Sequence, residues 1–418
     1  MGTADRLIFH CDCNNFFASC ECLERPELKD VPMAVAGDPE YRTGIVVAKN
    51  ELAKKAGVKT TDTVWQAQRK CPGIVFVPPR HSFYSEVSER VNAIYHEYTE
   101  YLEPASIDES YLDMTGVPPF YGLEAVELAD LLRERVRNEI GITISVGVSY
   151  NKVFAKMGSD YKKPDATTVI TKDNFKEILW PLPVSDLLFA GRATVDVLHK
   201  KLIRTIGDLA QRDRDYMTRL LGKAGEQLWV YANGLDDAPV RQWGDVEEVK
   251  FVSRGMTFRR DLVTEQEVYS GLSVLADDVA TQLRRQSLKG SVIQVQIKTP
   301  ALKSYSRQVT LNHHTFLQKE ILDTAMQLMR NNWHIGTSAP VRALTVGVTH
   351  LVPADQASEQ LSIFDMGMET DTKQIDREKQ ERLEAAVDLL RQKHGRDKIV
   401  CGFRDDEDLG ILRSKKEK

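Results

Sequence analysis

Short apolar runs alternate with amphipathic stretches over the first 170 residues. Residues Arg6–Cys11 predict a buried strand that ends on Asp12, and Thr143–Val148 predicts a second strand because polar and apolar residues alternate there. Apolar residues at helical spacing predict helices between these strands, the longest over Phe83–Tyr101 and Ala125–Glu139. Strands that alternate with helices indicate an α/β or α+β domain.

The pattern changes after Pro183. From there to Gly234 the sequence predicts short helices separated by glycine turns, and a polar stretch with one proline then predicts a linker. Strands and two helices follow over Val249–Val352, which predicts a small α+β domain. A charged helix is predicted over Gln374–Lys393. The whole pattern predicts an α+β multidomain protein.

Length and composition agree with this division. A chain of 418 residues is too long for one compact core and predicts two to four domains. Apolar residues make up 42% and charged residues 28%, as in ordinary globular proteins. Because no apolar run reaches membrane-spanning length and the start does not resemble a signal peptide, we expect no membrane partner and a cytoplasmic location.

Charge is unevenly distributed. The net charge of −5 argues against a nucleic-acid partner, but Lys250–His350 holds thirteen Lys and Arg against seven Asp and Glu, a local charge of +6. A basic segment inside an acidic protein is typical of contact with a phosphate backbone, although a solvated surface gives similar counts.

Three carboxylates stand at the predicted strand ends. Asp12 follows the first strand, and Asp108 and Glu109 are neighbours between two strand-like runs. Adjacent strand residues point to opposite faces, so both acids serve one site only if Ser106–Glu109 forms a turn. Three gathered carboxylates repel one another and require a divalent cation; oxygen ligands suit Mg²⁺, and two ions suit displacement at phosphorus. Surface acids on loops are the alternative.

Four segments in order change the balance between these interpretations. They are FHCDCNNFFASCE (Phe9–Glu21), AKNELAKKAGVKT (Ala48–Thr60), SIDESYLD (Ser106–Asp113) and SVGVSYNKVFAKMGSDYKKPD (Ser145–Asp165). In sequence and spacing they resemble the Y-family DNA polymerases of the DinB/UmuC type, and the resemblance covers about Leu7–Phe364.

The resemblance implies a right-hand polymerase. Its parts would be a ferredoxin-like palm, small fingers, a thumb with helix-hairpin-helix units and an α+β little finger. In this sequence the boundaries would be residues 1–22 and 80–168 for the palm, 23–79 for the fingers, 169–234 for the thumb, 235–248 for the linker, 249–352 for the little finger and 353–418 for the tail.

The resemblance also implies a reaction. The chain would add dNTPs to the 3′ end of primer-template DNA with low fidelity and would bypass lesions. Asp12, Asp108, Glu109 and the backbone carbonyl of Cys13 would hold two Mg²⁺ ions. A nucleotide cyclase with a related palm would need no thumb, and a non-catalytic DNA-bound clamp adaptor would not need the three acids; both stay open as alternatives.

Four residues are expected at the incoming nucleotide by resemblance. Phe17 matches the steric gate that excludes a ribose 2′-hydroxyl, and Phe16 lies beside it, with core packing as the alternative for both and favoured for Phe16. Lys163 matches the lysine that contacts the triphosphate. Lys54 stands where DinB-type chains have Arg, and a lysine lacks the bidentate fork of arginine.

Other matches to the family are less direct. Arg80 and Tyr84 resemble a pattern near the nucleotide, with a structural role favoured for Tyr84. Lys152 and Lys156 are i, i+4 neighbours on one predicted helix, and ordinary surface charge is the alternative interpretation for both. The paired cysteines Cys11, Cys13, Cys20 and Cys22 permit a zinc site, but a strand followed by a helix favours core packing.

The remaining expectations concern macromolecular partners. Glycine turns at Gly191, Gly222 and Gly225 would present helix N-termini to DNA phosphates, with a purely structural turn as the alternative. In the little finger, Arg254, Arg259 and Arg307 are the candidate phosphate contacts. The tail segment 360–365 resembles the peptide that binds the bacterial sliding clamp, through Gln360, Leu361, Ile363 and Phe364. We expect a monomer.

Overall fold

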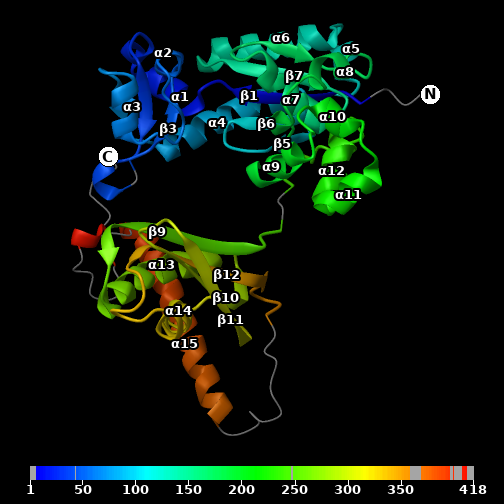
Figure 1. The fold of residues 1–418 in the computed structure, drawn as a ribbon. Coiled ribbons are helices and arrows are strands. Elements are labelled where there is room, and N and C mark those ends of the chain that lie inside the picture. The colour runs from blue at the N-terminus through cyan, green and yellow to red at the C-terminus, as the bar shows by residue number, and fades with distance from the viewer. Residues whose placement is uncertain are drawn as a thin grey trace. The chain divides into compact units, whose positions relative to one another are not determined.

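The computed structural model describes residues 6–42, 44–245, 248–357, 369–395, 399 and 407–411. The chain forms two compact units (Figure 1). The first contains Met1–Gly37 and Ile45–Val246, and the second contains Asp38–Gly44 and Glu247–Lys418.

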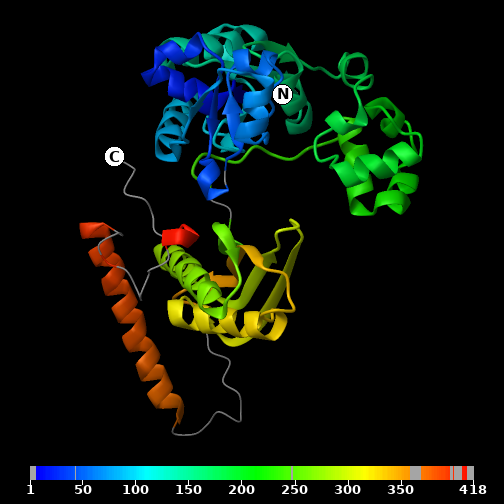
Figure 2. The same ribbon diagram turned by 60° about the vertical axis from the view of Figure 1, so that its left-hand side comes forward.

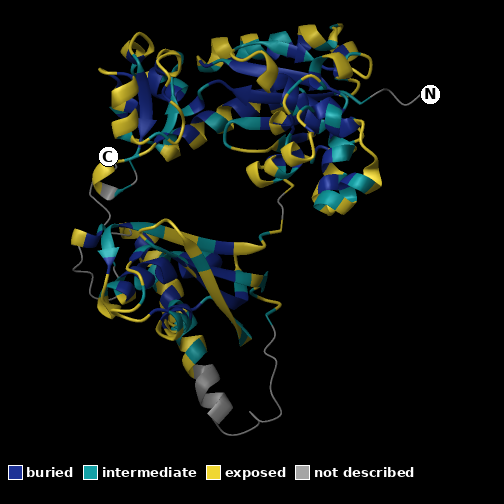
Figure 3. Cartoon of the chain, viewed as in Figure 1, coloured by how far each residue is buried: buried dark blue, intermediate teal, exposed yellow. Residues whose placement is uncertain are grey.

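A five-stranded sheet is the centre of the first unit. Its order is β5-β6-β1-β7-β8, with bounds Leu102–Pro104, Glu109–Asp113, Ile8–Cys13, Ile144–Ser149 and Thr167–Val169. All six residues of β1 are buried, which suits its central position (Figure 3). Because β5, β6, β1 and β7 are antiparallel neighbours, and helices separate β1 from β5 and β6 from β7, the ferredoxin-like palm predicted above is confirmed.

Three helices cover the palm sheet. Phe9 and Cys11 of β1 pack with α4 (His81–His96) and α6 (Ala125–Arg135). On the other face, α7 (Lys152–Tyr161) lies close to β7, since a Cβ added to Gly147 would lie 1.8 Å from the carbonyl oxygen of Ala155. Strand alternation therefore directs Asp12 to the side of α7. Helix α5 (Val117–Tyr121) precedes α6, and α6 continues as a π-helical turn (Val136–Ile140).

The helix α4 ends earlier than the sequence pattern indicates. It stops at His96 rather than at Tyr101 because Leu102, which is fully buried, begins β5 and pairs with Leu112 of β6. The backbone therefore has to leave the helix before that residue.

The fingers form a small sheet with helices between its strands. The order is β3-β2-β4, with bounds Val46–Lys49, Met33–Ala36 and Val75–Val77. Helix α1 (Phe16–Glu24) leads in from the palm and is followed by a 3₁₀ turn at Pro26–Lys29, with another at Pro39–Tyr41. Asn50 caps α2 (Glu51–Lys55), and a Thr63 capping box starts α3 (Val64–Lys70).

The thumb is a group of short helices around one apolar core. Their bounds are Phe175–Leu179 (α8), Val184–Asp186 (η4), Arg192–Lys200 (α9), Ile206–Ala210 (α10), Arg214–Leu221 (α11) and Lys223–Ala232 (α12).

The polar stretch after the thumb lies along the palm. Val240 is buried with Ile8 and Tyr111, and Glu103 accepts hydrogen bonds from the backbone N–H and side chain of Arg241. Residues 235–245 are therefore packed in the first unit and not only a tether.

The second unit is a four-stranded antiparallel sheet with two helices on one face (Figure 2). The order is β11-β10-β12-β9, with bounds Ser304–Thr315, Leu288–Lys298, Val341–Pro353 and Phe251–Leu262. The helices are α13 (Glu265–Arg285) and α14 (Gln318–Asn332). This agrees with the predicted α+β little finger.

The tail helix α15 (Glu369–His394) is held to this unit by charges. Arg391 contacts Asp277 at 2.9 Å, Asp388 contacts Arg284 at 2.6 Å, and both pairs are mostly buried. A 3₁₀ turn at Glu407–Leu409 adds Leu409 to the core. Arg391 and Asp388 of α15 thus face its own domain.

Candidate active site

The acidic residues meet at one end of the palm sheet. Asp12 of β1 lies opposite Glu109 of β6 in the strand register. The turn that the sequence requires is present, because the N–H groups of Ala105 and Ser106 both donate to the Glu109 carbonyl, at 2.8 and 3.2 Å. The Cys13 N–H donates to the Asp108 carbonyl at 2.9 Å. Two stretches almost a hundred residues apart are thereby fixed side by side.

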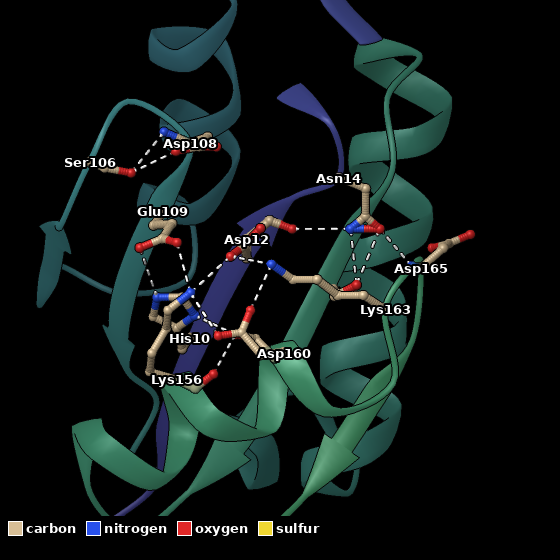
Figure 4. Close-up of polar contacts among 12 residues, drawn as sticks. His10, Asp12, Asn14, Ser106, Asp108, Glu109, Lys156, Asp160, Lys163 and Asp165 are labelled. Atoms are coloured by element: carbon tan, nitrogen blue, oxygen red, sulfur yellow. Dashed lines mark hydrogen bonds and ion pairs between the residues drawn. The ribbon is translucent and has the colours of Figure 1, made fainter. Parts of the chain in front are cut away.

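Lysine ammonium groups lie between these carboxylates (Figure 4). The Nζ of Lys156 is 3.0 Å from Asp12 Oδ2 and 2.7 Å from Glu109 Oε1, and the Nζ of Lys163 is 2.6 Å from the same Asp12 oxygen. The Lys156 side chain is only 14% exposed. Its interpretation as a surface charge is therefore wrong.

Asp108 is turned away from this cluster. Its Oδ1 accepts a hydrogen bond from Ser106 Oγ at 2.7 Å, and Figure 4 shows it directed away from Asp12 and Glu109. Within the described part of the chain, no three His, Cys, Asp or Glu side chains are arranged as a ready metal site. The structure thus brings the side chains of Asp12 and Glu109 together, whereas Asp108 is held beside them through its backbone carbonyl.

The electrostatics of the cluster favour a cation. Burial raises the pKa of Glu109, and its contact with Asp12 raises it further, while the Lys156 ammonium opposes both. Burial disfavours the charged form of Lys156, but the Asp12 and Glu109 carboxylates outweigh burial and raise its pKa. The carboxylates already hold positive groups between them, so this oxygen-donor set fits a hard divalent ion.

A buried histidine underlies the cluster. Burial, and then the charges of Lys156 and Lys163, lower the pKa of His10 well below its ordinary value, so the ring is neutral. Its Nδ1 lies 2.8 Å from Ser159 Oγ, and its Nε2 lies 3.8 Å from Glu109 Oε2. Sequence reasoning missed this residue, because its partners Ser159 and Glu109 come from α7 and β6, which are distant from it along the chain.

The two phenylalanines of α1 have different surroundings. Phe17 is half-buried and stacks on Tyr84, with ring centroids 4.2 Å apart and planes at 17°. Phe16 is only 3% exposed and packs in the palm core. This burial supports the core alternative for Phe16, and its expected nucleotide contact stays a prediction.

A buried acid anchors the Phe17–Tyr84 pair. Glu21 is fully buried; its Oε1 accepts hydrogen bonds from Tyr84 Oη (2.7 Å) and Arg80 Nε (3.0 Å). Its Oε2 accepts from Arg80 Nη2 and Arg25 Nη2, both at 2.9 Å. Arg80 is thus engaged by protein acids. An acid four residues after Phe17 on a helix rich in Phe, Ala and Cys is the signal from which this network can be predicted.

The remaining nucleotide candidate lies in the fingers. Lys54 Nζ is 3.3 Å from Glu51 Oε1, and Glu51 also accepts a hydrogen bond from Asn15 Nδ2 at 2.9 Å. The Lys54 side chain is about half exposed, so its ammonium is accessible to an anion.

The four cysteines of the first 22 residues pack in apolar cores. Cys11, Cys13 and Cys20 belong to the palm core, and Cys22 lies in a separate cluster with Ala18. Burial raises the pKa of each of these thiols. Core packing, the favoured interpretation, is confirmed.

Known families match both units. A family model described as the impB/mucB/samB family matches residues 11–160, and the model of its C-terminal domain matches residues 249–363. A DNA polymerase IV of Acetivibrio thermocellus is 44% identical over 93% of this chain and 95% of its own length. The chain belongs to the Y-family DNA polymerases.

Other relatives agree with this membership. The DNA polymerase IV of Clostridium kluyveri is 36% identical over 95% of this Y-family chain and 98% of its own length, and the DNA polymerase IV 1 of Bacillus subtilis is 36% identical over 93% and 91%. A solved Y-family DNA polymerase chimera shares the fold, with a TM-score of 0.72 at 22% identity over 83% of this chain and 99% of that one.

The thumb of this Y-family polymerase places its three candidate glycines differently. Gly191 starts α9 and Gly222 starts α12, the latter with a φ of +64°. Gly225 lies inside α12, where an added Cβ would be 2.1 Å from the Met217 carbonyl oxygen and its N–H donates to Gly222. Gly225 therefore lets α11 and α12 pack closely, and its expected phosphate contact stays a prediction.

Phe189, two residues before Gly191 in the first hairpin, has an unusual backbone conformation. This residue has a φ of +67°, which glycine adopts without strain, and its side chain is 73% exposed.

The candidate arginines of the little finger lie at the sheet edges. Arg254 of β9 donates to Gln282 of α13 at 3.4 Å, and Arg307 of β11 donates to Asn332 of α14 at 2.9 Å. In the strand register Arg254 lies opposite Val346 and Arg307 lies opposite Val295, and both valines are buried. Both arginine side chains therefore lie on the helix-covered face of the sheet. Arg259 is half-buried.

The open face of that sheet carries a set of uncharged polar side chains, and sequence reasoning missed it. Alternation with the buried residues places on it one set of Ser, Thr and Gln side chains, namely Ser253, Thr345, Gln294, Gln296, Ser306 and Gln308. Counting charges along the segment cannot reveal such a face.

The candidate clamp-binding residues Gln360, Leu361, Ile363 and Phe364 lie outside the described residues. Among the described residues, no helix is both long enough and apolar enough to cross a membrane.

Proposed function

We propose that this chain is a low-fidelity, lesion-bypassing DNA polymerase whose palm carboxylates hold two Mg²⁺ ions. Polymerase activity follows from membership of the family. The finer assignment rests on one observation: Asp12 and Glu109 lie side by side around positive groups at the edge of the palm. Asp108 and the Cys13 carbonyl complete the ligand set once the Asp108 side chain leaves Ser106.

The side chains around this set prepare the substrates. Bound metal supplies an activated primer 3′-hydroxyl and charge neutralisation at the leaving pyrophosphate. Phe17, supported by Tyr84, presents a ring to the sugar and excludes a 2′-hydroxyl. Lys163 and Lys54 provide positive charge for the triphosphate; Lys163 is the nearer of the two to the carboxylates.

DNA is held without reading sequence. In the thumb, the N-terminal N–H groups of α9 and α12, next to Gly191 and Gly222, face phosphate oxygens. In the little finger, the polar open face of the sheet contacts the duplex, and the edge residues Arg254, Arg259 and Arg307 supply charge beside it. Segment 360–365 binds a sliding clamp, and the protein acts as a cytoplasmic monomer.

The two alternatives lose support from the extent of the similarity. A cyclase shares only the palm, whereas relatives called DNA polymerase IV match this chain over more than nine-tenths of its length. A clamp adaptor needs no catalytic acids, whereas Asp12 and Glu109 are both present in this chain and lie around lysine ammonium groups.

The test is primer extension on a primed template with dNTPs and Mg²⁺. Asp108→Ala should abolish extension and leave the affinity for primer-template, measured by fluorescence anisotropy, close to wild type. Asp173→Ala, which removes an exposed acid in the loop before α8, is the matched control and should extend normally. Substantial turnover by the Asp108 variant would exclude the proposed ligand set.

A further inference from the structure

The palm carboxylates have internal cations of their own. Two ammonium groups, those of Lys156 and Lys163, share the same Asp12 oxygen, and Lys156 also reaches Glu109. The Asp12 side chain is 6% exposed, so this neutralisation occurs largely out of water, where an unpaired carboxylate is costly. A divalent ion that uses the same oxygens must therefore compete with the lysines.

Both lysines have a second acceptor outside the carboxylate pair. Asp160, the single acid of α7, lies 3.2 Å from the Nζ of Lys156 and 2.8 Å from the Nζ of Lys163. Its side chain is half exposed, so it lies on the solvent side of the cluster. If the Lys156 ammonium leaves Asp12, it therefore keeps Asp160 of the same helix as a partner.

We propose that Lys156 is a positioning residue that occupies the metal-binding oxygens until a divalent ion displaces it, and that Asp160 retains the displaced ammonium. The proposal rests on the metal site of the proposed function. It implies that the nucleotide-free enzyme binds metal weakly. A triphosphate offers Lys163 a new anion, so metal and nucleotide load together.

Lys156→Met removes one competitor and keeps much of the apolar stem. In the full-length protein without DNA or nucleotide, we expect the affinity for Mn²⁺, measured by electron paramagnetic resonance, to rise about tenfold. Even in water, the repulsion between a unit positive charge and a divalent ion about 4 Å apart lowers the affinity for the ion by more than about tenfold. Lys156→Arg retains the charge and should restore affinity to near the wild-type value.

Asp160→Asn should act in the opposite direction. Without their second acceptor, both lysines stay on Asp12 and Glu109, and the affinity for Mn²⁺ should fall about threefold or more. Lys152→Met is the matched control: Lys152 lies one turn earlier on α7 and pairs with Glu103 at 2.7 Å, away from the metal carboxylates, so it should leave Mn²⁺ affinity unchanged. If these residues of α7 had only a structural role, Lys156→Met and Asp160→Asn would not change the Mn²⁺ affinity in opposite directions.

The outcomes separate this inference from the proposed function. If Asp12→Asn leaves Mn²⁺ binding intact, the metal site itself is wrong. If binding requires Asp12 but Lys156→Met leaves it unchanged or weakens it, the competition is wrong and the metal site stands. Should Lys156→Met fail to fold, Asp160→Asn still decides, because an unchanged or raised affinity overturns the proposal.

Discussion

Glu21 anchors Tyr84, on which Phe17 stacks, and Glu21→Gln tests that support. The substitution keeps the shape of the side chain and replaces one carboxylate oxygen by an NH₂ group. Four donors now converge on the two oxygens of Glu21, from Arg80 twice, Arg25 and Tyr84. A glutamine accepts only at its single oxygen, so two donors lose their acceptor and face another donor.

The magnitude follows from these contacts. Hydrogen bonds to a charged group contribute about 1.5–3 kcal/mol each, so two of them give about 3–6 kcal/mol. The side chains of Arg80 and Arg25 are 38% and 42% exposed, so water replaces part of what they lose. A loss of about 2–3 kcal/mol remains, which corresponds to a fall of roughly 5–10 °C in the melting temperature of the first unit.

Calorimetry of the full-length protein measures this fall. Glu24→Gln is the matched control, because Glu24 contacts the same Arg80 from the same helix but is 53% exposed; its loss should stay below about 0.5 kcal/mol. The Tyr84 hydroxyl also loses its firm anchor, so discrimination between dNTP and rNTP should weaken in Glu21→Gln. Melting temperatures of the two variants within about 1 °C of each other would refute the reasoning.

Three further predictions concern other parts of the chain. Phe17→Ala should raise ribonucleotide incorporation at least about tenfold, and an unchanged ratio of rNTP to dNTP use in single-nucleotide insertion would remove its role as steric gate. Burial alone would raise the pKa of Glu320, but hydrogen bonds from His313, Thr315 and Arg377 lower it to about 2 from an ordinary 4.5. The ionised Glu320 therefore contributes about 3 kcal/mol to the free energy of unfolding above pH 4.5, and this contribution is lost as the pH falls from 4.5 to 2. In Glu320→Gln, the free energy of unfolding measured with urea should change less with pH over that interval. Deletion of residues 360–365 should shorten the products of processive synthesis only when a sliding clamp is present.

Local patterns in the sequence predicted the elements and their type. The strand before Asp12, the strand at Ile144–Ser149 and the two helices of the little finger follow from periodicity alone. The turn at Ser106–Glu109 was required by two adjacent acids that must serve one site, and the structure contains it.

What the sequence could not predict depends on contacts between distant elements. Lys156 reads as a surface lysine on its helix, and only the pairing of β1 with β6 places two carboxylates beside it. The basic segment predicts phosphate contacts for Arg254 and Arg307, but strand register decides on which face of the sheet each side chain lies. Net charge carries no information on register.

The packing of residues 235–245 along the palm determines how the protein can be divided. A catalytic fragment that stops at Gly234 would lose Val240, which covers Ile8 and Tyr111, and would leave Glu103 with Lys152 but without Arg241. The apolar patch so exposed adjoins β1, the strand that carries Asp12. A soluble palm, fingers and thumb therefore need the eleven residues up to Asp245, even though these contribute no helix or strand.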